Sequence, residues 1–359
     1  MEKERAHLQE LAMAWHHANR VAPFSMRDIR ASLAAIDAHL IPDSAKADCR
    51  KNPKVSTPGR RPIGANLKVI ASIGNSDHGE GRQLAQHYRK LIEPIALRGG
   101  STNLDVLRVV LLREFPWMWD LVEDLFDELN LRRAAGVPWL HFAPILIVGP
   151  SGVGKTRFAR RLAQLVGTGF REINAAGSSD NRLLVGTARG WHAPQPALPL
   201  LVMGNSGSAN PIIVVDEIDK AKSDGHNGDV RDSLLAFLEA ETARIWFDEC
   251  LLAECDLSQV SWILTANITN EIPAPLLSRV RVVHVDRPLA IHFDATLASI
   301  VGEFARELGL APNELPELGG AAQSQLRVRF EKNASVRELK SSVRRAISKS
   351  AALLDPVVH

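Results

Sequence analysis

The sequence has little of what marks a secreted, fibrous or membrane protein. Its 359 residues include only 3 cysteines, too few for a disulfide framework, so we expect a reducing compartment. No apolar run approaches the roughly 18 residues that a membrane-spanning helix needs. The first residues, MEKERAHLQELAMAW, lack the apolar segment of a secretory signal. We therefore expect a cytoplasmic protein with no membrane partner.

Neither sign of charge dominates, because 43 Lys and Arg stand against 41 Asp and Glu. The positive excess lies early, in a stretch rich in proline and glycine that contains Lys46, Arg50, Lys51, Lys54, Arg60 and Arg61. We interpret residues 41–66 as a flexible basic linker preceded by two helices, over 3–20 and 25–40. A solvated tether is favoured over a nucleic-acid-binding arm, because no aromatic residues interleave with the charges.

The next part of the chain predicts mostly helices. We expect a short strand over 67–73, a helix over 80–95, and helices on both sides of Pro116 within 104–135. The large apolar residues of this last segment are expected in the core, with an adenine-stacking role for part of the region as the alternative. They are Phe115, Trp117, Met118, Trp119, Leu121 and Leu125.

The strongest motif begins where an apolar strand ends. Residues 144–149 read PILIVG, as expected of a central parallel strand buried on both faces. They lead into the pattern G-x-x-x-x-G-K-[ST], formed by Gly149, Pro150, Ser151, Gly152, Val153, Gly154, Lys155 and Thr156. A helical pattern follows, with Arg157, Arg160 and Arg161 expected to face solvent. Strand, loop and helix are the context that a phosphate-binding loop requires.

The residue types in this loop suit a nucleoside triphosphate. Glycines let the backbone curl so that N–H groups point at an anion, and the helix N-terminus adds partial positive charge. Lys155 can reach the β- and γ-phosphates, and the Thr156 hydroxyl can hold Mg²⁺. We therefore predict ATP and Mg²⁺ as the cofactors.

Two further strands end in polar residues. The run PIIVVDEID places Asp216 and Glu217 after a β-favouring segment, and SWILTAN ends at Asn267. Carboxyl ends of parallel strands are where ligands bind in such sheets. We predict Asp216 as an Mg²⁺ ligand, Glu217 as the residue that polarises an attacking water, and Asn267 as a hydrogen-bonding partner of the water or the γ-phosphate. Together, these strand ends predict a site for attack on a phosphoanhydride.

The order of these motifs resembles the AAA+ ATPase family and, within it, the ATPase module of Lon-type proteases. The resemblance rests on the phosphate loop, Asp216-Glu-Ile-Asp-Lys220, Thr265-Ala266-Asn267 and Ile272-Pro273-x-Pro275-Leu-Leu-x-Arg279, over roughly residues 100–350. It implies that Asn267 is the first sensor. It also implies that Arg279 is an arginine finger, which reaches the nucleotide of a neighbouring subunit.

The resemblance assigns three more residues. Arg337, in ASVREL, falls where the family has its second sensor, a lid residue that contacts the nucleotide. Trp191 falls at the aromatic position of the Lon pore loop, beside His192, where it would grip a polypeptide. The alternative for Trp191 is a core side chain, but the surrounding glycines and prolines favour an exposed loop.

We therefore predict an α/β fold of the three-layer phosphate-loop NTPase type, with a five-stranded parallel sheet. The expected parts are a mostly helical N-terminal region over 1–100, an AAA+ nucleotide-binding domain over 101–288 and a helical lid over 289–359. No room is left for the Lon peptidase domain, so we expect an ATPase that is not a protease.

The expected function is Mg²⁺-dependent ATP hydrolysis by a ring oligomer, a hexamer by resemblance, that remodels or unfolds a protein client as a chaperone does. A separate protease or effector docking on the ring is an open expectation. The alternatives are a nucleic-acid-associated AAA+ motor or loader, with a nucleic acid as the less favoured partner, and an ATP-binding switch or scaffold with little turnover.

Overall fold

The computed structural model describes residues 66–77, 79–176, 181–221 and 229–354. The helices expected over 3–20 and 25–40 lie outside these residues, as does the expected linker apart from Asn66. In the part of the chain that the structure describes, no helix is both long and apolar enough to cross a membrane.

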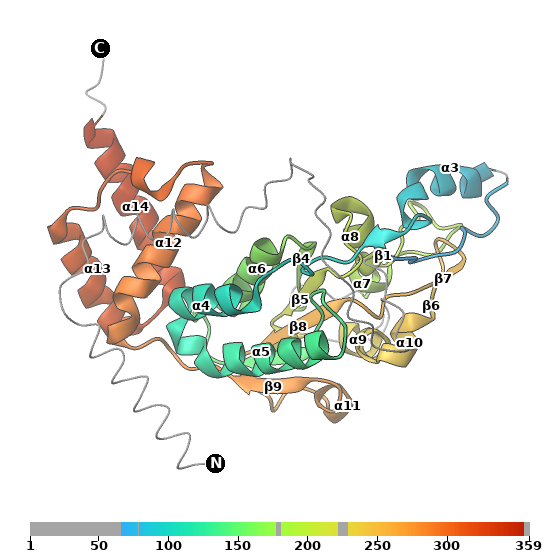
Figure 1. The fold of residues 1–359 in the computed structure, drawn as a ribbon, viewed down its shortest axis with the longest axis horizontal. Helices are drawn as coiled ribbons and strands as arrows, with labels where there is room; N and C mark the ends of the chain where they lie inside the picture. The colour runs from blue at the N-terminus through green and yellow to red at the C-terminus, as the bar shows by residue number, and fades with distance from the viewer. Residues whose placement is uncertain (1–65, 78, 177–180, 222–228, 355–359) are drawn as a thin grey trace, which may run out of the picture.

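A parallel sheet forms the centre of the molecule (Figure 1). Within the described residues it has five strands in the order β4-β5-β8-β3-β9, and each neighbouring pair is parallel. The three inner strands are almost wholly apolar and fully or nearly fully buried, as expected of strands covered on both faces. The fold class predicted from the sequence is confirmed. The strands are β3 (Ile145–Val148), β4 (Phe170–Asn174), β5 (Ile212–Asp216), β8 (Ser261–Ala266) and β9 (Arg281–His284).

Alternate side chains of the strands enter two different cores. One face, with Ile145 and Ile147 of β3, packs against α4 (Leu104–Glu114), α5 (Trp119–Ala134) and α6 (Lys155–Val166). The other face, with Leu146 and Val148, packs against α8 (Leu198–Ser206), α9 (Val230–Leu238) and the chain before α4. Because successive side chains of a strand point to opposite faces, both faces of the sheet are covered, and the domain has three layers with the sheet in the middle. Shorter elements on the second side are α7 (Arg182–Val185), α10 (Ala240–Arg244), and the hairpin of β6 (Trp246–Asp248) and β7 (Ala253–Cys255), while α11 (Ala274–Leu277) precedes β9.

A helical unit follows the sheet at one end of the molecule (Figure 1). It consists of α12 (Phe293–Glu307), α13 (Gly320–Asn333) and α14 (Val336–Leu354), which share their own apolar core. We call these three helices the lid. All three helices lie within residues 289–359, where the sequence predicts a helical lid. The boundaries predicted between the domains stay a prediction.

The segment before α4 differs from the expected strand and helix. Residues 66–97, which we call the strap, contain β1 (Asn66–Leu67), α3 (Gly79–His87) and β2 (Ile95–Ala96), and β1 pairs with β2. The prediction of a strand over 67–73 is therefore mostly wrong. The apolar side chains of this run are buried in the core, but its backbone does not continue the ladder of hydrogen bonds between β1 and β2. The expected helix ends early, at His87, and a short 3₁₀ turn follows it.

Two of the three arginines expected at the surface of α6 do not face solvent: Arg161 is buried and Arg157 is mostly covered. Arg161 is paired with Glu114 of α4 at 2.8 Å, and both side chains are almost fully enclosed. Arg157 lies against the lid, while Arg160 does face outward and pairs with Glu172. The prediction was wrong for Arg157 and Arg161 because their acidic partners lie far away in the sequence. Trp119, expected in the core, is 45% exposed.

The buried Arg161–Glu114 pair predicts a large effect on stability. Arg161→Met should lower the free energy of unfolding by about 3–5 kcal/mol, because it leaves the Glu114 carboxylate buried without its partner. Arg160→Met, one position away in an exposed pair, should change it by less than about 1 kcal/mol. Urea denaturation of both variants measures the difference. Equal losses would contradict a special role for the buried pair.

Candidate nucleotide site

The phosphate loop connects β3 to α6 and is shaped by its glycines. Gly152 and Gly154 have φ angles of +82° and +100°, in the left-handed region that side chains rarely adopt. A Cβ atom at Gly149 would lie 2.1 Å from the carbonyl oxygen of Val285, so only glycine fits there. Gly154 directly precedes α6, whose N–H groups therefore open toward the loop. This geometry suits an anion held by backbone N–H groups.

Lys155 lies inside the loop and is 9% exposed. Its Nζ donates to the carbonyls of Gly149 at 2.6 Å and Pro150 at 3.2 Å, and to Asn267 Oδ1 at 3.2 Å. Burial lowers the pKa of Lys155, and the nearby acids, led by Asp216, oppose that shift. The ammonium group is thus enclosed by oxygen atoms that accept its hydrogen bonds. The oxygens of a bound phosphate could take over these hydrogen bonds.

Thr156 and Asp216 face each other from α6 and the end of β5. The Thr156 hydroxyl donates to Asp216 Oδ1 at 3.1 Å, and the same carboxylate oxygen accepts from the hydroxyl of Thr265 on β8. Hydroxyl and carboxylate oxygens are the hard ligands that Mg²⁺ takes. The two residues predicted to hold the metal therefore lie together, and their chemistry fits it.

Glu217 follows β5 with a φ of +57°. Its backbone N–H donates to Thr265 Oγ1 at 3.1 Å, and its carboxylate accepts from Lys220 Nζ at 2.6 Å. The hydrogen bond from Lys220 is the main cause that lowers the pKa of Glu217, and one from Asn174 at the end of β4 adds to it. The carboxylate is therefore held ionised at the edge of the sheet where β3, β5 and β8 end.

Asn267 reaches the same edge from β8. Its backbone N–H donates to Asp219 Oδ2 at 2.9 Å, so the carboxylate of Asp219 fixes the turn that carries the Asn267 side chain. Roles for Thr265 and Asp219 were not predicted, although both stand inside the motifs. Their positions follow from the sheet, which places the ends of β5 and β8 side by side.

The lid contacts the loop directly. The backbone N–H groups of Val336 and Arg337, at the start of α14, donate to the carbonyl of Gly152 at 2.9 and 3.3 Å. A Cβ atom at Gly152 would lie 3.7 Å from the Cβ atom of Arg337, so Arg337 lies beside the loop. The residue predicted to contact nucleotide from the lid thus lies next to the loop.

Trp117 contacts the loop from the side of α5. Its indole Nε1 donates to the carbonyl of Val153 at 3.0 Å. Its ring lies 6.2 Å from that of His292, just before α12, between their centroids. Phe115 and Met118 are buried as predicted, but Trp117 is only half-buried and packs on both the sheet core and the lid core. Residue type alone did not reveal this position, because the loop lies far along the sequence.

Arg279 lies away from the loop of its own chain. It precedes β9, whose first residue, Arg281, pairs with Ile145 at the beginning of β3. The loop begins after Val148, about 13 Å further along the strand direction. Arg279 donates to the carbonyl of Pro275 and pairs with Glu239 at 3.4 Å. It therefore lies toward the opposite end of the sheet from Lys155.

Trp191 and His192 lie at an exposed turn, and Trp191 is 67% exposed. Thr187 and Gln195 pair across the base of this turn. Arg189 anchors it by donating to the carbonyls of Cys250 at 2.9 Å and of Gly74, in the strap, at 2.6 Å. The sequence predicted the exposed turn, but it did not predict the hydrogen bonds by which Arg189 anchors this turn.

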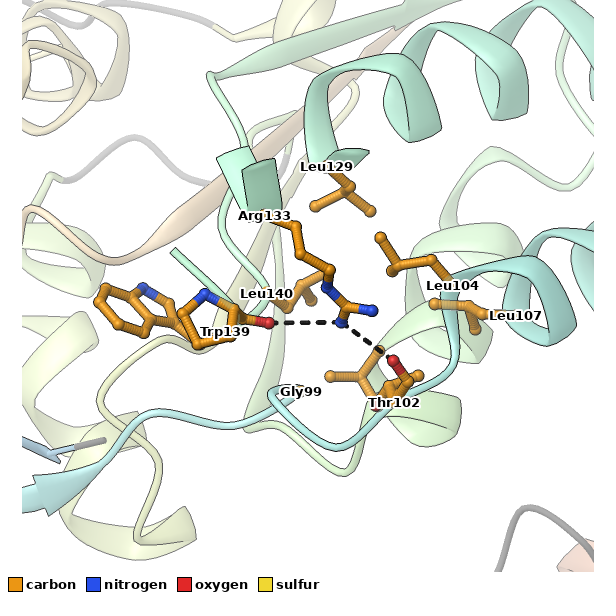
Figure 2. A pocket seen from close by; sticks show the side chains of 10 residues that line it. Gly99, Thr102, Leu104, Leu107, Leu129, Arg133, Trp139 and Leu140 are labelled. Carbon is orange, nitrogen blue, oxygen red and sulfur yellow. Dashed lines mark hydrogen bonds between the residues drawn. The ribbon is translucent and has the colours of Figure 1, made fainter. Parts of the chain in front are cut away.

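A small cavity elsewhere in the sheet domain is not part of this site (Figure 2). Leucines of α4 and α5 line it, and Arg133 points across it. The Arg133 guanidinium donates to the carbonyls of Thr102 at 2.9 Å and Pro138 at 3.4 Å. Its lining includes no residue of the phosphate loop, and the hydrogen bonds of Arg133 join the chain before α4 to the end of α5.

Comparisons with known proteins agree with this geometry. A model of the family described as "ATPase family associated with various cellular activities (AAA)" matches residues 145–287. Lon protease homolog 4, chloroplastic/mitochondrial, of Arabidopsis thaliana is 30% identical over 211 residues, which are 58% of this chain and 22% of that protein. The Lon protease of Magnetococcus marinus is 30% identical over 272 residues, 76% of this chain and 31% of that protein.

The Lon protease of Halothermothrix orenii is 29% identical over 261 residues, 70% of this chain and 32% of that protein. The chain thus spans about a quarter to a third of the length of these relatives. The resemblance inferred from the motifs is confirmed. Residues 145–287 match the AAA family, and the relatives named here that align with this region are Lon proteases.

Proposed function

We propose that this chain is an Mg²⁺-dependent ATPase that works as an oligomer and remodels protein clients. The observation that carries the proposal is the meeting of Lys155, Thr156, Asp216, Glu217 and Asn267 at one edge of the sheet. Each comes from the end of a strand or from the helix after it. That is the arrangement needed to hold a triphosphate and to orient water for attack on it.

The binding roles follow from charge and donor type. The phosphate-loop N–H groups and Lys155 would hold the β- and γ-phosphates, and Thr156 and Asp216 would hold Mg²⁺. The metal, when bound, supplies positive charge that offsets the charge of the phosphate oxygens. Arg337 would add a second cation from the lid, since it lies at the start of α14, beside Gly152.

The hydrolytic roles fall to Glu217 and Asn267. A water oxygen attacks the γ-phosphorus, the bond to the bridging oxygen breaks, and ADP and phosphate leave. Glu217 would orient this water and take its proton, for which its ionised carboxylate is suited. Asn267, tied to Lys155 at 3.2 Å, would hold the water or the γ-phosphate in line.

A second subunit would complete the site. Because Arg279 lies toward the far end of the sheet from its own phosphate loop, it would act on the nucleotide of a neighbour. Its permanent charge and forked donors suit that role. We therefore propose a ring, with six subunits as the expected number.

Protein clients are favoured over nucleic acids. An exposed tryptophan on an anchored turn suits side-chain contact with a polypeptide, and the relatives of this region are named proteases. The proposal assigns ATP hydrolysis to this chain and not cleavage of the client. The basic segment behind the nucleic-acid alternative lies outside the described residues. ATP hydrolysis stimulated by DNA and steeply weakened by salt would favour that alternative.

The catalytic assignment is tested with Glu217→Gln. Binding of ATP should persist, while the rate of phosphate release should fall by about 10²–10⁴-fold, because the amide cannot take a proton from water. Calorimetry measures binding and a phosphate assay measures turnover, with Glu254→Gln on β7 as the control. Unchanged turnover would remove the catalytic role. Binding without turnover in the unmodified protein would favour the switch alternative.

The Lys220–Glu217 pair predicts a shift in pH dependence. A carboxylate base works when deprotonated, so activity is present above its pKa and is lost as the pH falls through it. Lys220→Met removes the main interaction that lowers the pKa of Glu217, so the acidic limb of the kcat profile should move to higher pH. Lys90→Met, another exposed lysine, should leave the profile in place. A limb that stays still, or moves to lower pH, would contradict the assignment.

Trp191 predicts an effect on clients. With an unfolded protein such as casein as the probe, Trp191→Ala should reduce the ratio of stimulated to basal ATP hydrolysis to about one, because the exposed ring is lost. Trp119→Ala, which removes another exposed indole, should leave the ratio unchanged. Full stimulation of the Trp191 variant would remove the client-gripping role.

A further inference from the structure

A network of partly buried charges joins the phosphate-loop helix to the lid. Arg157, the residue after Thr156, donates through Nε to Glu303 Oε2 at 2.6 Å and through Nη2 to Ser299 Oγ at 2.6 Å. Both partners lie on α12. The side chains of Arg157 and Glu303 are only 12% and 15% exposed. The first turn of α6, which would hold the phosphates, therefore also holds α12.

The network continues to the third lid element. The other oxygen of Glu303, Oε1, accepts from Lys340 Nζ on α14 at 2.6 Å. Lys340 lies three residues after Arg337, and residues at that spacing are neighbours on a helix. One carboxylate of α12 thus connects Arg157 of α6 with the turn of α14 that follows Arg337.

The beginning of α14 is fixed at a second point. The N–H groups of Val336 and Arg337 bind the carbonyl of Gly152, as described above. A hydrogen bond at the helix start leaves the direction of the helix axis free to change, whereas a second attachment one turn later restricts it. Glu303 supplies that second attachment through Lys340.

The attachment stays charged under ordinary conditions. Burial alone would raise the pKa of Glu303, but the charges and hydrogen bonds of Arg157 and Lys340 outweigh it and lower the pKa to about 2. Two cations therefore face one ionised carboxylate in a partly enclosed place. Removing its charge would leave both cations without their shared partner.

We infer that Glu303, bound between Arg157 and Lys340, is a positioning residue that holds Arg337 over the phosphate loop. The inference rests on the proposed function, because it gives Arg337 a nucleotide to contact. It predicts that the affinity for ATP depends on a carboxylate that itself contacts none of the residues assigned to the nucleotide or the metal. It also predicts that this dependence passes through Arg337.

The same two helices offer a matched control. Glu307, one turn beyond Glu303 on α12, pairs with Arg344 of α14 and is 40% exposed. Its described bonds reach Arg344 and, at the longer distance of 3.4 Å, Lys340, both on α14, and none of them reaches α6. Glu307→Gln therefore removes one carboxylate between the same helices without disturbing the link to the phosphate loop.

The test is a double-mutant cycle measured by the dissociation rate of a fluorescent ATP analogue from the full chain. Glu303→Gln should speed dissociation about tenfold, and Glu307→Gln less than about twofold. In an Arg337→Ala background, Glu303→Gln should add nothing, because the residue through which it acts is gone. Lys340→Met removes the bonds from α14 to Glu303 and, at 3.4 Å, to Glu307, but leaves the Arg157–Glu303 pair in place, so it should reproduce most of the effect. It also serves if Glu303→Gln fails to fold, as judged by circular dichroism.

The outcomes separate the inference from the proposed function. If the unmodified protein does not bind the analogue, both fail. If it binds and the effects of Glu303→Gln and Arg337→Ala simply multiply, the inference is overturned, because Glu303 then acts independently of Arg337. Equal effects of Glu303→Gln and Glu307→Gln would also overturn it, since general loosening of the lid would explain both.

Discussion

The rest of the structure depends on the hydrogen bonds that the backbone carbonyl groups of the phosphate loop accept. Lys155 binds those of Gly149 and Pro150, α14 binds that of Gly152, and Trp117 binds that of Val153. These four carbonyls are thus held by the helix that follows the loop, by the lid and by the segment before α5. A phosphate that draws the Lys155 ammonium away would free two of these carbonyls. The others would still tie the loop to Trp117 and the lid, so a change of loop shape would reach both.

The sequence was informative where function depends on local order. The apolar strand, the glycines and Lys155 follow one another directly, and the ends of β5 and β8 meet them because neighbouring parallel strands end at the same edge. The five-stranded sheet and the gathering of Asp216, Glu217 and Asn267 could therefore be anticipated. The Lon-like order of motifs added Arg279, Arg337 and Trp191, which no local pattern indicates.

The sequence was uninformative where charge is satisfied at long range. Arg157 and Arg161 lie four residues apart on one face of α6, and hydropathy assigns such a face to solvent. Their acids are Glu303 and Glu114, 146 and 47 residues away, so nothing local indicates that the face is buried. The strap was misjudged for a similar reason. Its run 67–73 has β-forming side chains, but these enter a core made by helices and loops from later in the chain.

The strap also explains how the exposed turn can be rigid. Gly74 and Cys250, far apart in the sequence, present their carbonyls to one guanidinium, that of Arg189. Arg98, the residue after the strap, is held in turn by Asn210, whose side chain bonds both the N–H and the carbonyl of Arg98. A force applied at Trp191 would therefore be carried by hydrogen bonds into the strap and the β6–β7 hairpin, and from there into the core under the sheet. Under the proposed function, nucleotide and client would act on one body, because α6, the helix that follows the phosphate loop, covers the other face of that sheet.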